Sequence, residues 1–280
     1  MKFSVLMSVY KNDNADYLLK AVQSVTIDQT LKPTQLVLVK DGPVPENIEA
    51  NIQKMQLALN DIGIEFTVIS KEVNAGLASA LNTGLEYCKY EYVARMDSDD
   101  ISLPNRFELE IPYIAGKPDI SILGGGITEF EDDERFPIQA RIVPQKHDEI
   151  VDMLRTRNGM NHVTVVFKKS DIVRLGGYSE DFGKLEDYKL WVDAVCAGLK
   201  LQNIPEICVN VRVGSGFIER RSNKREIQDW DMLQGYLKNA KLIGNRKALI
   251  NKLYIRVFIY MPAWMKKIAY KTILRKKERL

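Results

Sequence analysis

Three acids fall within four residues near position 100, where residues 95–100 read RMDSDD. They directly follow an apolar segment with the pattern of a β-strand. Carboxylates this close repel one another unless a cation offsets their charge. Mg²⁺ and Mn²⁺ prefer carboxylate oxygens and are commonly shared with the phosphates of a substrate. The spacing therefore predicts a divalent-metal and diphosphate site. The alternative is that Asp100 and its neighbours cap a following helix.

A second acidic pair, Glu186 and Asp187, opens an apolar segment with helical spacing. A carboxylate can take a proton from a hydroxyl nucleophile, so this pair is a candidate general base. The alternative is again helix capping, because acids are favoured in the first turn of a helix.

Single polar residues supply further candidates. Asn74 and Gly76 precede a helical pattern, where backbone N–H groups can bind an anion, although the pair also suits a tight turn. Asp41 ends an apolar strand, where it can bind a base or a ribose or simply form the next turn. Arg106 can offer a forked donor to a phosphate, with a solvated arginine as the alternative. His162 is one of two histidines, and a structural hydrogen bond is the alternative to a functional role.

The elements that must position these residues alternate in the first half of the chain. Strand-like apolar runs occupy residues 3–9, 35–39, 65–69 and 91–96, and helical spacing occurs at 17–25, 47–60 and 77–85. This alternation predicts an α/β domain with a largely parallel sheet. Ligands of such sheets bind at the carboxyl ends of the strands, where the acidic segment and Asp41 fall.

The second half is less regular. Strand-like runs occupy residues 120–123, 164–167 and 208–213, and helical patterns occupy 169–175 and 187–197. The only boundary signal is a weak one near Pro118. From about residue 227 the pattern is helical and basic.

Composition and charge narrow the class of protein. The 280 residues are 45% hydrophobic and 28% charged, as in an ordinary globular protein. Residues 241–280 hold twelve basic residues and one acid, a net charge of +11, whereas residues 1–240 carry a net charge of −8. A globally basic nucleic-acid-binding protein is not expected to show this pattern, which indicates a tail with its own anionic partner. Binding of DNA or RNA by the tail is the alternative, and it would show a steep salt dependence.

Three widely spaced cysteines fit neither a disulfide framework nor a zinc site, so we expect a reducing compartment. The longest uncharged run has thirteen residues, too few to span a bilayer, and the first residues lack the features of a signal peptide. We therefore expect a protein that neither spans a membrane nor is secreted.

Together these segments resemble the family 2 glycosyltransferases, which have the GT-A fold, over roughly residues 3–213. Six motifs match in the family's order. They lie at residues 3–10, at 24–33, at 38–42 with Lys40 in place of the usual acid, at 74–84, at 97–100 (DSDD), and on the acceptor side at 162, 176–178 and 186–191. Each motif is modest evidence alone, but six in register are not expected by chance.

The resemblance implies a UDP-sugar donor and a Mn²⁺ or Mg²⁺ cofactor. On the donor side it implies that Ser8 and Tyr10 line the base pocket and that Asp41 holds the uracil or ribose. Asp97 would contact the ribose or the metal, and Asp99 would ligate the metal. The residue pattern adds Asn74, Gly76, Arg106 and Arg220 to this side.

On the acceptor side, the resemblance implies that Asp187 is the catalytic base, with Glu186 beside it. His162 and Trp191 belong to the same acceptor-side pattern. A single displacement inverts the anomeric configuration. The chain lacks the Q-x-x-R-W motif of processive synthases, so we expect one sugar to be added per reaction.

The sequence departs from the family at residues 212–214, where RVG stands in place of R-x-H, so a histidine metal ligand is absent there. Arg212 or the basic cluster that includes Arg220 and Arg221 is a candidate to hold the diphosphate instead. A solvated basic face is the alternative for that cluster.

We therefore divide the chain into a nucleotide-sugar-binding half (1–117), an acceptor and catalytic-base half (118–226) of the same GT-A domain, and a basic, amphipathic helical extension (227–280). In the extension, Leu249, Leu253 and Val257 share a helical spacing with aromatic and basic residues nearby. Such a segment suits an anionic membrane surface, and packing on the domain is the alternative.

The resemblance also implies a location and an acceptor. Similar enzymes extend oligosaccharides on a lipid diphosphate, so we expect a lipid-linked glycan acceptor in bacterial surface polysaccharide synthesis. The enzyme would lie in the bacterial cytoplasm, peripherally on the inner face of the membrane. The alternatives are a nucleotidyltransferase and a non-catalytic nucleotide-sugar-binding relative. The donor sugar, whether hexose or N-acetylhexosamine, and the oligomeric state stay open.

Overall fold

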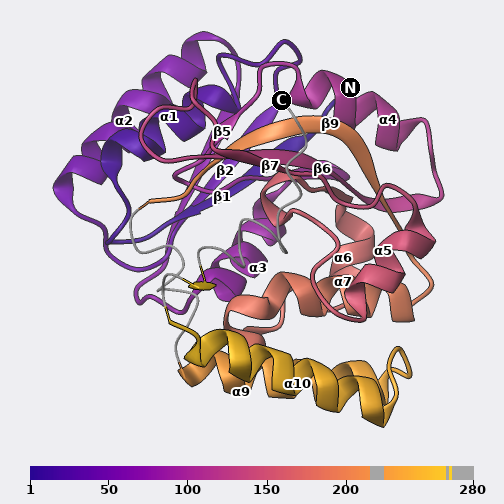
Figure 1. Ribbon diagram of the computed structural model, residues 1–280. Coiled ribbons are helices and arrows are strands. Elements are labelled where there is room, and N and C mark those ends of the chain that lie inside the picture. The colour runs from indigo at the N-terminus through magenta and orange to yellow at the C-terminus, as the bar shows by residue number, and fades with distance from the viewer. Residues whose placement is uncertain (215–223, 263–264, 267–280) are drawn as a thin grey trace.

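The computed structural model describes residues 1–214, 224–262 and 265–266. The first half of the chain forms the parallel part of a nine-stranded sheet (Figure 1). Four parallel strands stand in the order β3-β2-β1-β4: β1 (Ser4–Val9), β2 (Gln35–Lys40), β3 (Glu65–Ser70) and β4 (Tyr92–Arg95). The central strands β1 and β2 are buried over nearly their whole length, which explains their uninterrupted apolar sequences.

Helices cover both faces of the sheet, as predicted, and each face has its own apolar core. One core includes residues of α1 (Ala15–Ser24), α2 (Glu46–Asp61) and α4 (Arg106–Ala115). The other includes residues of α3 (Leu77–Tyr87), α5 (His147–Leu154), α6 (Lys169–Arg174) and α7 (Glu186–Cys196). The sequence analysis missed α5, which is only eight residues long.

The sheet continues without interruption into the second half of the chain. Its further strands follow in the order β8-β6-β9-β5, with β7 beside β6: β5 (Ile101–Ser102), β6 (Ile120–Phe130), β7 (Gln139–Arg141), β8 (Val166–Lys168) and β9 (Lys200–Arg212). β8 runs antiparallel to both β4 and β6, whereas β6 and β9 are parallel. The regions on either side of Pro118 therefore share one sheet.

Strand β6 is much longer than its apolar pattern predicts, because three consecutive glycines interrupt that pattern at 124–126. A Cβ on Gly125 would stand only 2.4 Å from the Cys208 sulfur on β9. The absent side chains let the two strands approach, so glycines that suggest a loop in the sequence serve close packing here.

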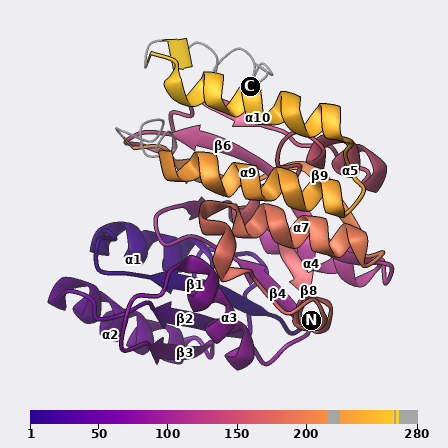
Figure 2. The same cartoon turned by 90° about the horizontal axis from the view of Figure 1, so that it is seen from below.

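Two helices form an outer layer beyond α7: α9 (Lys224–Asn239) and α10 (Asn245–Tyr260), as Figure 2 shows. The rings of Trp230 on α9 and Tyr188 on α7 meet edge to face, 5.9 Å apart. α10 packs on α9, and Asn251 donates hydrogen bonds to the Gln234 side chain and the Arg155 carbonyl. Within the described residues, no helix is long and apolar enough to cross a membrane.

Candidate active site

The acidic segment at 97–100 forms a loop directly after β4, at the edge where β1 and β2 also end. The Ser98 hydroxyl donates to the Asp13 carboxylate at 2.8 Å, and Asp13 also accepts from the Tyr10 amide at 3.1 Å. This bond joins the loop after β4 to the loop after β1. The sequence analysis missed Asp13, since a single acid in a polar loop has no distinctive spacing.

Arg95 holds the first acid of the loop. Its guanidinium is 2% exposed and donates from both terminal nitrogens to the two carboxylate oxygens of Asp97, with Nη1 at 2.6 Å from Oδ2. A forked pair of this kind fixes the orientation of the carboxylate as well as its charge. Asp97 is thereby partly neutralised and held in one position beside the rest of the loop.

Arg212 on β9 supports the loop from the other side. Its backbone amide donates to the buried Asp100 carboxylate at 2.8 Å, and its Nε donates to the Asp99 carbonyl at 3.2 Å. The guanidinium stacks on the rings of Tyr17 and Phe130, with its carbon 3.9 Å and 4.5 Å from their centres. Arg212 is 8% exposed. It therefore braces the loop, and does not present a free donor to a diphosphate.

Asp99 is the exposed acid of the loop. Local loss of water and the carboxylates of Asp97 and Asp13 raise its pKa to about 6. Such crowding of like charges is what a bound cation relieves. Within the described residues, no group of three or more ligating side chains surrounds one point. The residues thus fit a divalent ion held by one or two carboxylates and completed by a substrate's phosphates.

Asp41 lies at the same edge, but its carboxylate is engaged with the protein. It accepts hydrogen bonds from the Ala75 amide at 3.0 Å and the Gly76 amide at 2.8 Å, and Lys71 stands 3.4 Å away. The Asn74 side chain donates to the Asp41 carbonyl at 3.1 Å. The Gly76 amide does meet an anion, as predicted, but this anion is the Asp41 carboxylate of the same chain and not a ligand. The Asp41 carboxylate orders this loop, and is 5% exposed.

Arg106 does not face the open site, and its predicted contact with a phosphate is wrong for this structure. The side chain is fully buried, pairs with Glu110 at 2.9 Å and donates to the Arg95 carbonyl at 3.0 Å. Its charge is offset by Glu110 inside the core, and it supports the end of β4 that leads into the acidic loop.

Glu186 and Asp187, the two acids predicted to include the catalytic base, begin α7, and they have different surroundings. Asp187 accepts from the Asn158 side chain at 2.7 Å and from the Tyr188 amide at 2.6 Å. Glu186 is 5% exposed, and its Oε2 has no hydrogen-bond partner within the described residues. Burial, and then the charge of Asp187, raise the pKa of Glu186 to about 8. At neutral pH, Glu186 therefore keeps its proton. Burial also raises the pKa of Asp187, but the hydrogen bonds from the Tyr188 amide and the Asn158 side chain oppose this increase.

His162 contacts two aromatic side chains, those of Tyr178 and Trp191. The His162 Nε2 and the Tyr178 hydroxyl are 2.9 Å apart, and the His162 ring contacts the edge of Trp191 at 5.8 Å between centres. Burial, and then the charge of Arg95, hold the pKa of His162 well below its usual range, so the ring is neutral. Trp191 is fully buried. It supports His162 from below, and does not itself meet an acceptor.

Arg95 is the charge common to both sides of the site. Burial raises the pKa of Asp99 and of both acids at the start of α7, and the charge of Arg95 opposes each increase. The structure therefore brings together the acidic loop and the Glu186–Asp187 pair, although they are about ninety residues apart in the chain.

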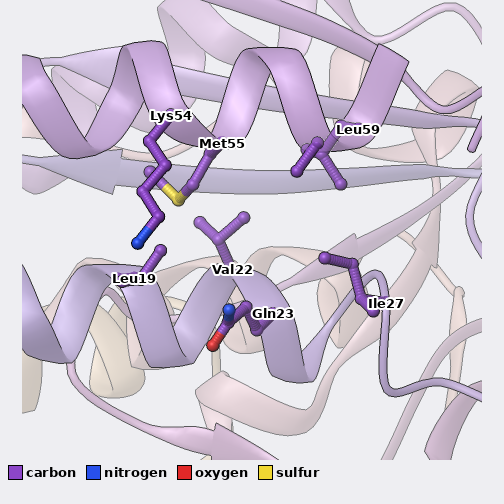
Figure 3. Close-up of a pocket in the computed structure, with 8 residues that line it drawn as sticks. Leu19, Val22, Gln23, Ile27, Lys54, Met55 and Leu59 are labelled. Carbon is purple, nitrogen blue, oxygen red and sulfur yellow. The ribbon is translucent and has the colours of Figure 1, made fainter. Parts of the chain in front are cut away.

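Ser8 on β1 is half-buried and Tyr10 is exposed at the same edge. Next to them is an open polar depression of about 480 Å³, lined by residues 12–14 of the loop after β1, by 15 and 16 at the start of α1, and by 47, 50 and 51 of α2. By contrast, the apolar pocket between α1 and α2 holds about 40 Å³ (Figure 3), too little for a nucleotide. The predicted Arg220, with Arg221, lies outside the described residues.

The family model described as "Glycosyl transferase family 2" matches residues 4–172. The chain belongs to this family. It is a glycosyltransferase, which confirms the resemblance drawn from the motifs. The match covers both the acidic loop and His162, but ends before the Glu186–Asp187 pair.

Two relatives extend the similarity over most of the chain. The chain is 35% identical to the amylovoran biosynthesis glycosyltransferase AmsE of Erwinia amylovora over 230 residues, covering 81% of this chain and 83% of the relative. It is 32% identical over 276 residues to the Escherichia coli UDP-Gal:alpha-D-GlcNAc-diphosphoundecaprenol beta-1,3-galactosyltransferase, covering 98% of this chain and 97% of the relative.

Solved structures share the fold at low sequence identity. S. aureus TarS 1–349 in complex with UDP-GlcNAc superposes with a TM-score of 0.65 at 17% identity, covering 98% of this chain and 77% of that one. The mannosyltransferase PcManGT from Pyrobaculum calidifontis, in complex with GDP-Man and Mn²⁺, superposes with a TM-score of 0.63 at 16% identity, covering 96% and 80%. These similarities confirm the predicted GT-A fold.

Proposed function

We propose that this glycosyltransferase moves one sugar from a UDP-sugar to a hydroxyl of a glycan acceptor, with inversion, during bacterial surface polysaccharide synthesis. The observation that carries the proposal is that one buried arginine, Arg95, holds Asp97 of the acidic loop by a forked ion pair and also interacts electrostatically with Glu186 and Asp187. The names of the two relatives, one for amylovoran and one for a galactosyltransferase, support the pathway class and the UDP-sugar.

Asp187 is the proposed base. The Asn158 side chain and the Tyr188 amide both donate hydrogen bonds to its carboxylate, which fixes its position and favours the ionised form over the protonated one. Asp187 takes the proton from the acceptor hydroxyl as that oxygen attacks the anomeric carbon, and the bond from this carbon to UDP breaks on the opposite face. One displacement inverts the configuration, and no covalent sugar–enzyme species is needed. Glu186, protonated, limits the negative charge beside the base.

The proposed donor site uses the strand edge. Asp99, with Asp97 beside it, would hold Mn²⁺ or Mg²⁺, which when bound offsets the charge on the diphosphate of the departing UDP. Arg95, Arg212 and Asp13 hold the loop in place before the donor arrives, so little reorganisation is required. Ser8 and Tyr10 line the proposed base pocket beside the polar depression.

The acceptor is proposed to be an oligosaccharide linked to a lipid diphosphate, as the name of the E. coli relative states for that enzyme. Such an acceptor is anchored in a membrane. The protein is then a peripheral enzyme on the inner face of the bacterial cytoplasmic membrane, with the extension from residue 227 nearest the lipid.

Thermal shift with nucleotides tests the donor site. UDP with Mn²⁺ should raise the melting temperature by a few degrees, since a ligand at about 100 times its Kd stabilises by about 2.7 kcal/mol. EDTA and Asp99→Ala should each abolish the shift, whereas Asp61→Ala, an exposed acid on α2, should keep it. A shift with Mn²⁺ and UDP but no UDP release from any UDP-sugar and acceptor would favour the non-catalytic relative. No shift at all would overturn the donor site.

A further inference from the structure

Helix α10 is apolar on two opposite faces. One face packs on α9 and holds the buried Ala248 and Ile259. The other face carries large apolar side chains that are 51% to 69% exposed. They are Leu249, Ile250, Leu253, Tyr254, Val257 and Tyr260. At about 100° per residue, these six side chains occupy one continuous arc of about 140°.

Such an arc is unusual on a helix that faces only water. A surface helix ordinarily turns its apolar stripe to the core and leaves the opposite side polar. Here the core-facing stripe already exists, so the second one requires another partner. Contiguous apolar patches of this kind mark interaction surfaces.

The charges around the arc select the partner. Arg246 lies within it and Lys247 at its edge, and both are exposed. No acid occurs between residues 232 and 277. Arg256 on α10 pairs with Asp231 on α9, and this ion pair leaves the charges of Arg246 and Lys247 in place. Two copies joined through these faces would bring like charges together, whereas an anionic surface would complement them.

Aromatic residues in the arc agree with a lipid surface. Tyr254 and Tyr260 have apolar rings with a polar hydroxyl, which suits the boundary between headgroups and acyl chains. An apolar arc with flanking Arg and Lys and interfacial tyrosines is the composition of a helix that lies in the plane of an anionic leaflet.

We propose that the exposed face of α10, defined by the six residues above, lies on an anionic lipid bilayer and orients the enzyme there. This inference rests on the proposed function in one respect, which is that a lipid-linked acceptor gives the enzyme a reason to lie at a membrane. Few elements separate α10 from the proposed catalytic base. α10 packs on α9, α9 contacts the turn at 180–185, and that turn leads directly into Glu186 and Asp187. Docking through α10 would thus bring the base-bearing half of the enzyme to the membrane.

The test is co-sedimentation of the full chain with vesicles, without donor or acceptor. Vesicles with phosphatidylglycerol should bind the protein, and vesicles of phosphatidylcholine alone should bind it at least tenfold more weakly. Leu253→Glu/Val257→Glu should lower binding to the anionic vesicles at least tenfold. Leu57→Glu, an equally exposed leucine on α2, should leave binding unchanged.

Three results would overturn the proposal. Unchanged binding of Leu253→Glu/Val257→Glu would mean that basic residues elsewhere in the extension act alone. Light scattering that shows a dimer broken by this variant, with no vesicle binding by the parent, would assign the face to a second copy. No binding by the parent and no dimer would leave the face without a lipid role. The UDP thermal shift is measured on the same samples, so loss of donor binding is distinguished from loss of docking.

Discussion

Arg95 and Asp97, two residues apart at the end of β4, form a forked ion pair in which the guanidinium is buried and the carboxylate remains 37% exposed. The buried partner sets the position of the exposed one. Because the same guanidinium acts electrostatically on Glu186 and Asp187, this pair links the proposed donor side to the proposed base.

Replacing Arg95 by Lys should lower kcat/KM at least tenfold, because an ammonium group cannot grip both oxygens of Asp97. The measurement is UDP release with donor and acceptor, with melting temperature as the check on folding. If the pair acts as a unit, Arg95→Lys/Asp97→Asn should lose less than the two single losses combined. Fully additive losses would show that the two residues act separately.

Asp187→Asn should reduce kcat by about 100-fold or more while UDP affinity stays the same, since only the proton acceptor is removed. An equal loss of UDP affinity would instead place Asp187 in the donor site.

The pH profile should report the hydrogen bond from Asn158. Burial raises the pKa of Asp187 and that bond opposes the increase, so Asn158→Ala should raise this pKa further and move the acid limb of kcat/KM to higher pH. Asn60→Ala, a change at an exposed asparagine on α2, is the matched control. A profile that does not move in Asn158→Ala would argue that another group is the base.

Glu186 should make stability fall as pH rises. Its pKa is about 8 in the folded protein against 4.5 in the unfolded chain, so the folded state keeps a proton that the unfolded state has released between these values. Glu186→Gln should therefore melt higher than the parent at pH 8, by a few degrees, and the two should converge near pH 4.5. Melting curves from pH 4.5 to 8.5 test this, and a constant difference between the two proteins would contradict it.

Arg106 should prove structural. Arg106→Met leaves Glu110 charged and buried, so unfolding should become easier by about 3–5 kcal/mol, with UDP affinity unchanged below the melting transition. Arg106→Met/Glu110→Leu should recover part of the loss. Weaker UDP binding without loss of stability would restore the predicted phosphate contact.

Much of the fold was predictable because its signals are local. The central strands β1 and β2 are buried on both faces, so their apolar runs mark them almost to the residue, as for residues 35–39 against the observed Gln35–Lys40. The predicted β6 was too short because the reason for its glycines lies in residues far away in the sequence, such as Cys208 on β9 against Gly125. The short helix α5 offered too few turns for a clear periodicity.

The sequence by itself determined the family, the α/β alternation and the residue types that do the chemistry, because motif spacing and apolar period are properties of neighbouring residues. Only the tertiary structure decided which of those polar groups are free. Arg106 forms an ion pair with Glu110, and Asp97 forms one with Arg95. The Asp41 carboxylate accepts hydrogen bonds from the amides at 75 and 76. The Asp99 side chain, by contrast, stays exposed. The physical reason is that a buried charge or amide must find a partner, and which partner it finds depends on how the chain brings its segments together.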